Sequence, residues 1–212
     1  MTFNPYYGGS DMINNIYKVI LIGLCFLAVS FKVESAAVEE KKSEKNIYAD
    51  MLSYAEKGEN NQVLALLASL KNRIAAIEKN YKINFDVRLK EAIQKSKKEV
   101  IKTIYALAYY DMKDTFNTIL NEIKSKEDVS VSDLKNELKY AYQCYLAVSP
   151  ILEEIDFEGN KEAKRAILII FNRDLQNAVS SKDISELEKK FLLIENVYNK
   201  NLKIESAESS TK

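Results

Sequence analysis

The chain has 212 residues, with 31 basic and 31 acidic side chains, no histidine and two cysteines. This balance lacks the basic excess that is typical of nucleic-acid binders, so no nucleic-acid partner is expected. The lack of histidine excludes imidazole-based zinc sites, haem ligation through histidine and His-based catalytic triads. The sequence also has no glycine-rich phosphate loop. We therefore predict a protein that is not an enzyme and that uses no metal or cofactor.

Residues 19–31 carry no charge and lie between Lys18 and Lys32. As a helix they would extend about 20 Å, which is shorter than the ~30 Å hydrocarbon core of a membrane. An apolar run of this length fits a signal peptide better. We therefore predict a signal peptide over residues 1–35, with its true start at Met1 or Met12 and cleavage near Ser35 or Ala37.

Two other interpretations of this leader remain open: an uncleaved anchor, and a lipid-modified N-terminus at Cys25. Lipid attachment usually needs a small residue before the cysteine, whereas Leu24 stands there. All three interpretations predict a secreted or extracytoplasmic protein. In the interpretation with a lipid on Cys25, the lipid would attach the protein to the cell surface. Membrane contact is expected only through the leader or a lipid on Cys25.

The remainder of the chain predicts an all-α fold. Residues 36–46 are charged, have no apolar period and are expected to form a flexible tether. Residues 47–200 contain only two glycines, Gly58 and Gly159, and one proline, Pro150. This composition favours long helices. We predict that they form an antiparallel bundle of about five helical segments, followed by a disordered tail over residues 201–212.

The first half of this bundle shows regular helical spacing. Residues 47–56 predict a short amphipathic helix that ends at Gly58. Residues 86–126 predict either one long helix or two. Between them, apolar residues recur at steps of four and three, which predicts a single helix with one core-facing seam: Val63, Leu67, Leu70, Ile74, Ile77 and Tyr81.

The second half begins after a polar connector, where Ser132 or Asp133 is expected to cap the next helix. Helical spacing continues from residue 138 to 155 through Pro150. A proline inside a helix removes a hydrogen bond and clashes with the preceding turn. Either the helix kinks there, or Ser149 caps a new helix with Pro150 at its first position.

Gly159 marks the next break, with Asn160 as the expected cap. Residues 166–171, "AILIIF", are apolar on every side and predict the most buried helix. The last helix is expected from Asp183, which forms a capping box with Glu186. Residues 98–111 also align without gaps to residues 161–174. This likeness indicates either a duplicated helical unit or a chance agreement between two amphipathic helices.

Asp111 lies on the apolar stripe of its predicted helix, and Asp174 repeats that pattern. A buried carboxylate must find a partner or remain protonated. Two interpretations remain open. The carboxylate makes a polar contact inside a ligand cavity, or it is structural, either in an ion pair or at the solvent-exposed edge of the apolar stripe. The candidate partners are Lys102, Lys113 and Arg173.

Tyrosines gather near Asp111 and again in the following helix. Tyrosine is enriched where proteins bind one another, but it also lines cores. We predict a binding site at Tyr105, Tyr109, Tyr110, Asp111, Tyr142 and Tyr145. Cys144 is expected to be a buried hydrophobe, because no histidine is available to activate it.

One further cluster, "EEIDFE" at residues 153–158, is dense in carboxylates. It could hold a hard cation or form a solvated helix end. Its spacing differs from that of an EF-hand loop, which favours the solvated helix end.

Three stretches resemble a known family: "KKEVIKTIYALAYYDMKDTFNTILNEI", "LKYAYQCYLAVSPILEEI" and "ELEKKFLLIENVYNKN". Over residues 98–200 the chain resembles the helical surface antigens of Borrelia, the group that includes complement-regulator-acquiring proteins. The resemblance implies binding of host proteins rather than catalysis, and it assigns no binding residue. Those antigens are lipoproteins, so Leu24 before Cys25 departs from the family pattern.

These observations favour a secreted or envelope-exported, non-enzymatic helical protein that binds a macromolecular partner such as a host protein. The alternative is a carrier of an apolar small molecule in a cavity lined by Tyr105, Tyr109, Tyr142 and Tyr145. A third class is a membrane-active helical protein with residues 166–171 as its insertion segment. These six apolar residues are far shorter than a membrane span.

Overall fold

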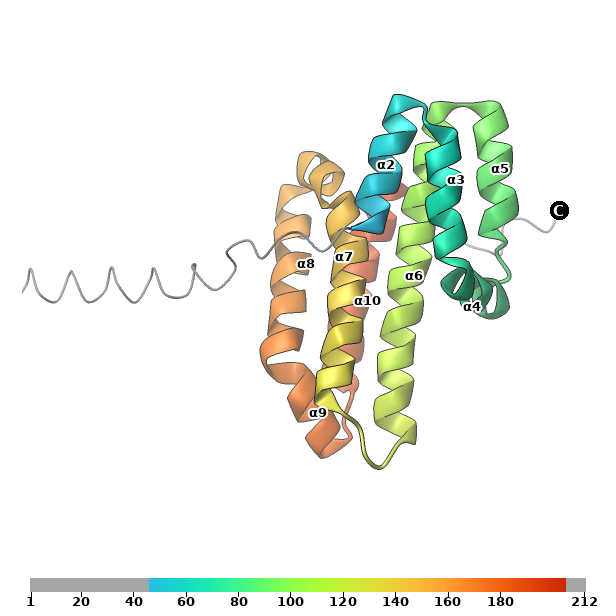
Figure 1. The fold of residues 1–212 in the computed structure, drawn as a ribbon. Coiled ribbons are helices and arrows are strands. Elements are labelled where there is room, and N and C mark those ends of the chain that lie inside the picture. The colour runs from blue at the N-terminus through green and yellow to red at the C-terminus, as the bar shows by residue number, and fades with distance from the viewer. Residues whose placement is uncertain (1–45, 205–212) are drawn as a thin grey trace, which may run out of the picture. The chain divides into compact units, whose positions relative to one another are not determined.

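The computed structural model describes residues 46–204, which contain helices and no strands (Figure 1). This confirms the predicted all-α fold. The predicted signal peptide, Cys25, most of the tether and residues 205–212 lie outside the described residues. Within residues 46–204, no helix is both long and apolar enough to cross a membrane.

Helices α6, α7, α8 and α10 lie side by side in the bundle, while α2, α3 and α5 gather at one end of α6 and α4 lies beside its middle (Figure 1). The chain reverses between α6 and α7, so these two helices are antiparallel. The elements are α2 (Ile47–Lys57), α3 (Asn60–Ser69), α4 (Lys71–Tyr81), α5 (Phe85–Lys95), α6 (Lys97–Ser125), α7 (Val131–Ile155), α8 (Phe157–Ile169), the π-helical turn η2 (Ile170–Asp174), α9 (Leu175–Ser181) and α10 (Ser185–Leu202).

Two of the predicted helix boundaries are settled by capping geometry. Gly58 ends α2 in the left-handed conformation with φ 77°, and its amide donates to the carbonyls of Tyr54 and Ala55. Glycine adopts this conformation without a Cβ penalty, as expected from the sequence. Ser96 separates α5 from α6 and accepts a hydrogen bond from the amide of Glu99. Of the two possibilities for residues 86–126, the structure therefore has two helices.

The single helix predicted over residues 63–81 is wrong, because the chain bends at Leu70 between α3 and α4. Leu70 has φ −90° and ψ 10°, and its amide donates to the carbonyl of Leu67 at 3.0 Å, as in a tighter 3₁₀ turn. The seam nevertheless faces the core on both sides of the bend: Val63, Leu67, Leu70, Ile74 and Ile77 are buried. The apolar periodicity therefore continues across the bend, although α3 and α4 are separate helices.

Helix α7 continues through Pro150, so Ser149 does not begin a new helix. Asn160 is not a cap either, because Asp156 caps α8 by accepting from the amide of Gly159 at 3.0 Å. Ser149 and Asn160 are both buried and bond to each other, with Ser149 Oγ donating to Asn160 Oδ1 at 3.2 Å. Both residues therefore join α7 to α8 instead of capping a helix.

The apolar run over residues 166–171 is not the most buried segment, because Leu168 is 50% exposed. Other helices cover α8 on one side only, so an all-round apolar sequence must expose one flank. The run then passes into η2, where the backbone widens to a π turn. Helix α10 begins at Ser185, and Asp183 accepts from the Ser185 amide at 2.9 Å instead of forming the predicted capping box.

The N-terminus of α7 gives a direct test of the capping geometry. Ser130, not Ser132 or Asp133, caps this helix by accepting from the amide of Asp133 at 3.3 Å. We expect Ser130→Ala to lower the free energy of unfolding by about 1 kcal/mol, because one helix amide loses its acceptor. The exposed Ser132→Ala should change it by less than about 0.5 kcal/mol. Equal effects in urea unfolding curves would contradict the assignment of Ser130 as the cap.

Candidate functional site

The six predicted binding residues do not form one surface. Asp111 is 1% exposed and bonds to side chains outside the predicted set. Tyr109, Tyr110 and Tyr145 are also buried. Tyr105 and Tyr142 are partly exposed and lie on different helices, α6 and α7. The structure therefore places most of the predicted site in the core of the bundle.

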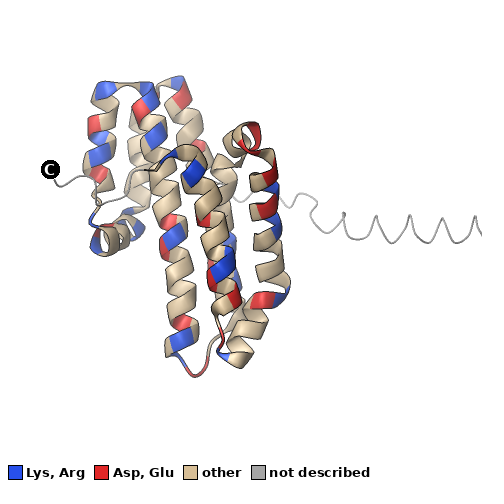
Figure 2. Cartoon of the chain, turned by 180° about the vertical axis from the view of Figure 1, so that it is seen from behind, with Lys and Arg blue, Asp and Glu red and all other residues tan. Residues whose placement is uncertain are grey.

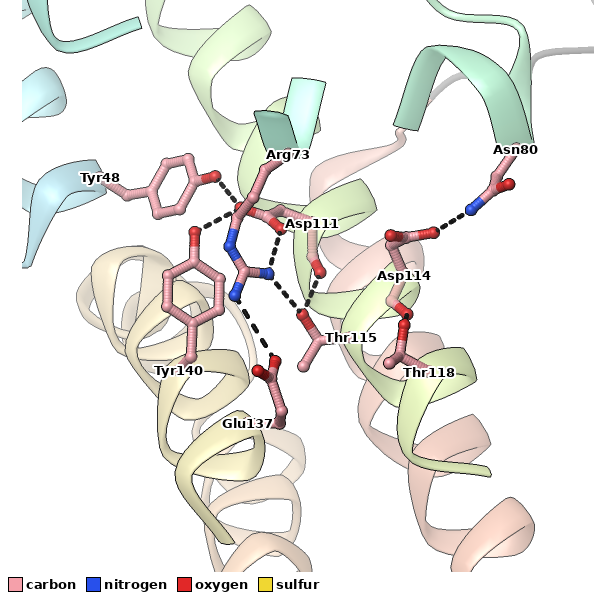
Figure 3. A network of polar contacts seen from close by, with 9 residues as sticks. All are labelled: Tyr48, Arg73, Asn80, Asp111, Asp114, Thr115, Thr118, Glu137 and Tyr140. Carbon is pink, nitrogen blue, oxygen red and sulfur yellow. Dashed lines mark hydrogen bonds and ion pairs between the residues drawn. The ribbon is translucent and has the colours of Figure 1, made fainter. Parts of the chain in front are cut away.

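Asp111 is the centre of a buried polar cluster that joins four helices (Figure 3). Tyr48 on α2 and Tyr140 on α7 both donate to Asp111 Oδ2, the latter at 2.5 Å. Arg73 on α4 donates to Asp111 Oδ1 at 3.2 Å. We call this cluster, together with two neighbouring side chains, the Asp111 network: Tyr48, Arg73, Asp111, Thr115, Glu137 and Tyr140.

Arg73 makes further contacts in the Asp111 network. Its guanidinium lies 3.5 Å from the centre of the Tyr140 ring, a cation–π stack. It also donates to Thr115 Oγ1 at 3.2 Å, and its second nitrogen lies 3.5 Å from a carboxylate oxygen of Glu137. The cation is thus held between two carboxylates and a ring. The lysines that the sequence offered as partners pair elsewhere: Lys113 with Glu195 and Lys102 with Glu99.

The protonation states in the Asp111 network follow from burial and charge. Burial raises the pKa of the Tyr48 hydroxyl well above its ordinary value, and the Asp111 carboxylate adds to this shift. Burial also raises the pKa of Tyr140, with smaller effects from Cys144 and Asp111. For Arg73, burial favours a lower pKa, but attraction to Asp111 and other neighbours raises it overall. Both hydroxyls therefore stay protonated as donors, and Arg73 stays charged.

The Asp111 network lacks the features of a catalytic centre. Its carboxylate is already occupied by two hydroxyls and a guanidinium, so it is not placed to act as a base toward a substrate. Cys144 lies nearby on α7 and is fully buried, and burial raises the pKa of its thiol. A protonated, enclosed thiol is a poor nucleophile. The arrangement fits the structural ion pair that the sequence left open for Asp111.

The buried tyrosines pack against one another. The rings of Tyr109 and Tyr110 are 5.2 Å apart, and Tyr109 lies at the same distance from Tyr198 on α10. Tyr198 donates to the carbonyl of Tyr105 at 2.8 Å, and Tyr145 donates to Asn160 Oδ1 at 2.8 Å. The hydroxyls of Tyr145 and Tyr198 are therefore satisfied within the bundle. This packing gives no support to the alternative of a tyrosine-lined carrier cavity.

Asp174 is buried at 6% exposure, as its alignment with Asp111 suggested, but its partners differ. Lys190 Nζ lies 2.9 Å from Asp174 Oδ2, and Arg173 Nε donates to Oδ1 at 2.8 Å. Although burial favours a higher pKa, these two cations lower the pKa of Asp174. Arg173 was among the partners expected from the sequence, whereas Lys190 was missed.

A different part of the bundle exposes apolar side chains. On α8, one flank carries Phe157, Lys161, Lys164 and Leu168 at steps of four, three and four, which places them along one line of the helix. Phe157 is 55% and Leu168 50% exposed. On α7, Tyr142, Leu146 and Pro150 lie four residues apart, and Leu146 is 38% exposed. Both flanks therefore present apolar groups to the surface.

The two flanks meet in a shallow groove of about 470 Å³ that includes Leu146 and Pro150 of α7 and Lys164 of α8. Lys164 pairs with Glu153 across it at 3.1 Å. Further along, Lys135 of α7 lies 5.0 Å from the ring centre of Phe171. We call this surface the α7–α8 face, and define it by six residues: Tyr142, Leu146, Pro150, Phe157, Lys164 and Leu168.

Charge is distributed unevenly along the α7–α8 face. Its α7 flank begins with Lys135 and Lys139, passes through the apolar residues, and ends with Glu153 and Glu154. Figure 2 shows acidic positions gathered where α7 passes into α8. This acidic end is the "EEIDFE" cluster, and within residues 46–204 no group of side chains is arranged to hold a metal ion. The α7 flank is therefore basic at one end, apolar in the middle and acidic at the other, whereas Lys161 and Lys164 of α8 pair with carboxylates at the acidic end.

Comparisons with protein-family models, curated proteins and solved structures found no significant match. Of the predicted binding residues, only Tyr142 belongs to the α7–α8 face. Leu168 belongs to the apolar run over residues 166–171, for which the sequence predicts burial, and no role was predicted for Phe157 or Lys164.

Proposed function

We propose that the chain is an exported, non-enzymatic helical protein that binds a macromolecular partner through the α7–α8 face. The observation that carries this proposal is the exposure of Leu146, Phe157 and Leu168 on the neighbouring helices α7 and α8. Isolated exposed apolar residues are common, but several gathered on one pair of helices are typical of protein-binding surfaces. Interface centres are likewise enriched in aromatic side chains.

The partner that fits this face is an amphipathic helix of another protein. Such a helix lays an apolar stripe into a groove, with anchors at steps of three and four residues. The charges of the α7 flank define the partner's orientation, since its acidic residues would lie beside Lys135 and Lys139 and its basic residues beside Glu154, because Lys164 already pairs with Glu153. Complementary charges of this kind set orientation and association rate more than affinity.

Three other observations support the export and binding parts of the proposal. The leader-like residues 1–35 favour export. The complete lack of histidine and the occupied Asp111 network favour a role without catalysis. The resemblance of residues 98–200 to helical Borrelia surface antigens favours a host protein as the partner.

Site-directed photo-crosslinking tests this proposal in the protein's native surroundings. A photoreactive residue at Leu168 reports on the α7–α8 face, and the same residue at Leu192 of α10 is the matched control, because Leu192 is 57% exposed. We expect one defined adduct from position 168 whose crosslinked peptide is helical, apolar on one side and charged at both ends. Adducts of equal yield from both positions, or adducts with segments of other chemistry, would contradict the proposal.

A further inference from the structure

The α7 flank of the α7–α8 face has the same spacing when it is followed from either end. Leu146 lies at its centre, with Tyr142 four residues before it and Pro150 four residues after it. Lys139 lies seven residues before this centre and Glu153 seven residues after it, so the two charges are opposite. At about 100° per residue, all five side chains lie within about 40° of one line along the helix. The flank is therefore symmetric in position about Leu146 and opposite in charge across it.

Two charged side chains near the ends of this flank form no ion pair within residues 46–204: Lys139 and Glu154, which are both exposed. The carboxylate of Glu153, in contrast, already pairs with Lys164 of α8 at 3.1 Å. Glu154 lies in the last turn of α7, which contains no basic residue. Because the C-terminal end of a helix carries a partial negative charge, a cation supplied by another chain would be stabilised beside Glu154.

We infer that, while no partner is bound, a second copy of this chain covers the α7–α8 face by antiparallel pairing of α7 with α7. This inference rests on the proposed function, because it takes the same face as the binding surface and adds the regulation of access to it. A two-fold axis at Leu146 places each residue opposite the one that lies equally far on the other side. Leu146 then packs on Leu146 of the second copy, and Tyr142 packs on Pro150. At both ends of the contact, Lys139 of one copy lies beside Glu154 of the other.

The charges of the α7 flank favour the antiparallel pairing over a parallel one. In a parallel pair, Lys139 would face Lys139 and Glu154 would face Glu154, and like charges opposed across an interface are costly. A single pair of helices is a small contact, below the roughly 1,200 Å² of stable complexes. We therefore expect weak self-association, with a Kd of roughly 10–100 μM. A contact of this strength can be displaced by a partner helix that binds the same face more tightly.

Sedimentation equilibrium of the full chain, at concentrations from about 5 to 200 μM, tests this inference by charge reversal. We expect Lys139→Glu and Glu154→Lys each to weaken self-association by about tenfold or more, because each opposes like charges at both ends of the contact. An equimolar mixture of these two variants should associate about as tightly as the wild-type chain, since both ends of the mixed pair then join opposite charges. Circular dichroism would verify that both variants keep the fold.

Lys98→Glu is the matched control, because it makes the same charge change at an exposed position of α6. Equal effects of the Lys98 and Lys139 variants would overturn the inference. So would a mixture that associates no better than the separate variants, or a wild-type chain that stays monomeric throughout. If the chain is monomeric but position 168 still crosslinks to another protein, this inference fails and the proposed function stands. If self-association follows the expected pattern but no other protein is crosslinked, the self-pairing stands and the proposed function fails.

Discussion

Replacing Asp111 by alanine is expected to lower the free energy of unfolding by about 3–5 kcal/mol. The carboxylate is 1% exposed and accepts from Tyr48 and Tyr140, so its removal leaves two hydroxyl donors without their acceptor. Each buried unsatisfied polar group costs about 1–3 kcal/mol. Arg73 would also lose its closer carboxylate partner and keep only Glu137 at 3.5 Å. Urea unfolding followed by circular dichroism measures the change.

Asp114 is the matched control for this prediction, because it lies one turn later on the same helix. Its carboxylate accepts from the exposed Asn80 at 2.6 Å, as Figure 3 shows beside the Asp111 network. Asp114→Ala should therefore cost less than about 1 kcal/mol. Asp111→Asn should fall between the two alanine variants, since an amide oxygen still accepts from a hydroxyl. Similar losses for Asp111→Ala and Asp114→Ala would show that the Asp111 network does not join the helices.

Alkaline pH is expected to destabilise the protein strongly. Tyrosines of an unfolded chain ionise near pH 10, whereas burial raises the pKa of Tyr48, Tyr140 and Tyr198 in the folded protein. The unfolded state therefore releases protons first as the pH rises. The stability that these tyrosines contribute is complete below about pH 10 and is lost above it. Each tyrosine that ionises only on unfolding removes about 1.4 kcal/mol per pH unit.

With three such tyrosines, the free energy of unfolding should fall by several kcal/mol between about pH 9 and pH 11. Urea unfolding curves across that range measure the slope. The double variant Tyr48→Phe/Tyr140→Phe should lose stability more gradually, because two of the linked protons are gone. A loss of stability between pH 9 and pH 11 that is as steep in the double variant as in the wild-type chain would contradict this prediction.

The fold class was predictable because it follows from local patterns. The steps of four and three from Val63 to Ile77 identified the core-facing residues, and all five of these seam residues are buried. The scarcity of glycine and proline in residues 47–200 favoured long helices as their secondary structure. The bend at Leu70 was not predictable, because no proline or glycine marks it. On the two sides of the bend the helices pack against different elements, α3 against α2 and α4 against α6 and α5.

The candidate site was less predictable, since its contacts join residues that are distant in sequence. The apolar stripe placed Asp111 on the core side of its helix but left open whether it is buried, and the structure buries it at 1% exposure. Its cation, Arg73, lies 38 positions earlier in the chain, and no local spacing connects the two. The exposure of Leu168 depends on which flank of α8 the other helices leave open. Periodicity shows that a side chain is apolar, but only tertiary packing decides whether water or another helix covers it.

Binding of a partner by the α7–α8 face is tested by the affinity of purified variants for the crosslinked partner. We expect Phe157→Ser/Leu168→Ser to weaken binding by about 2 kcal/mol, or roughly thirtyfold, because two anchors no longer bury apolar surface. Leu192→Ser, at a similarly exposed leucine, should change affinity less than about twofold. Equal affinities for the wild-type chain and the double variant would contradict the claim.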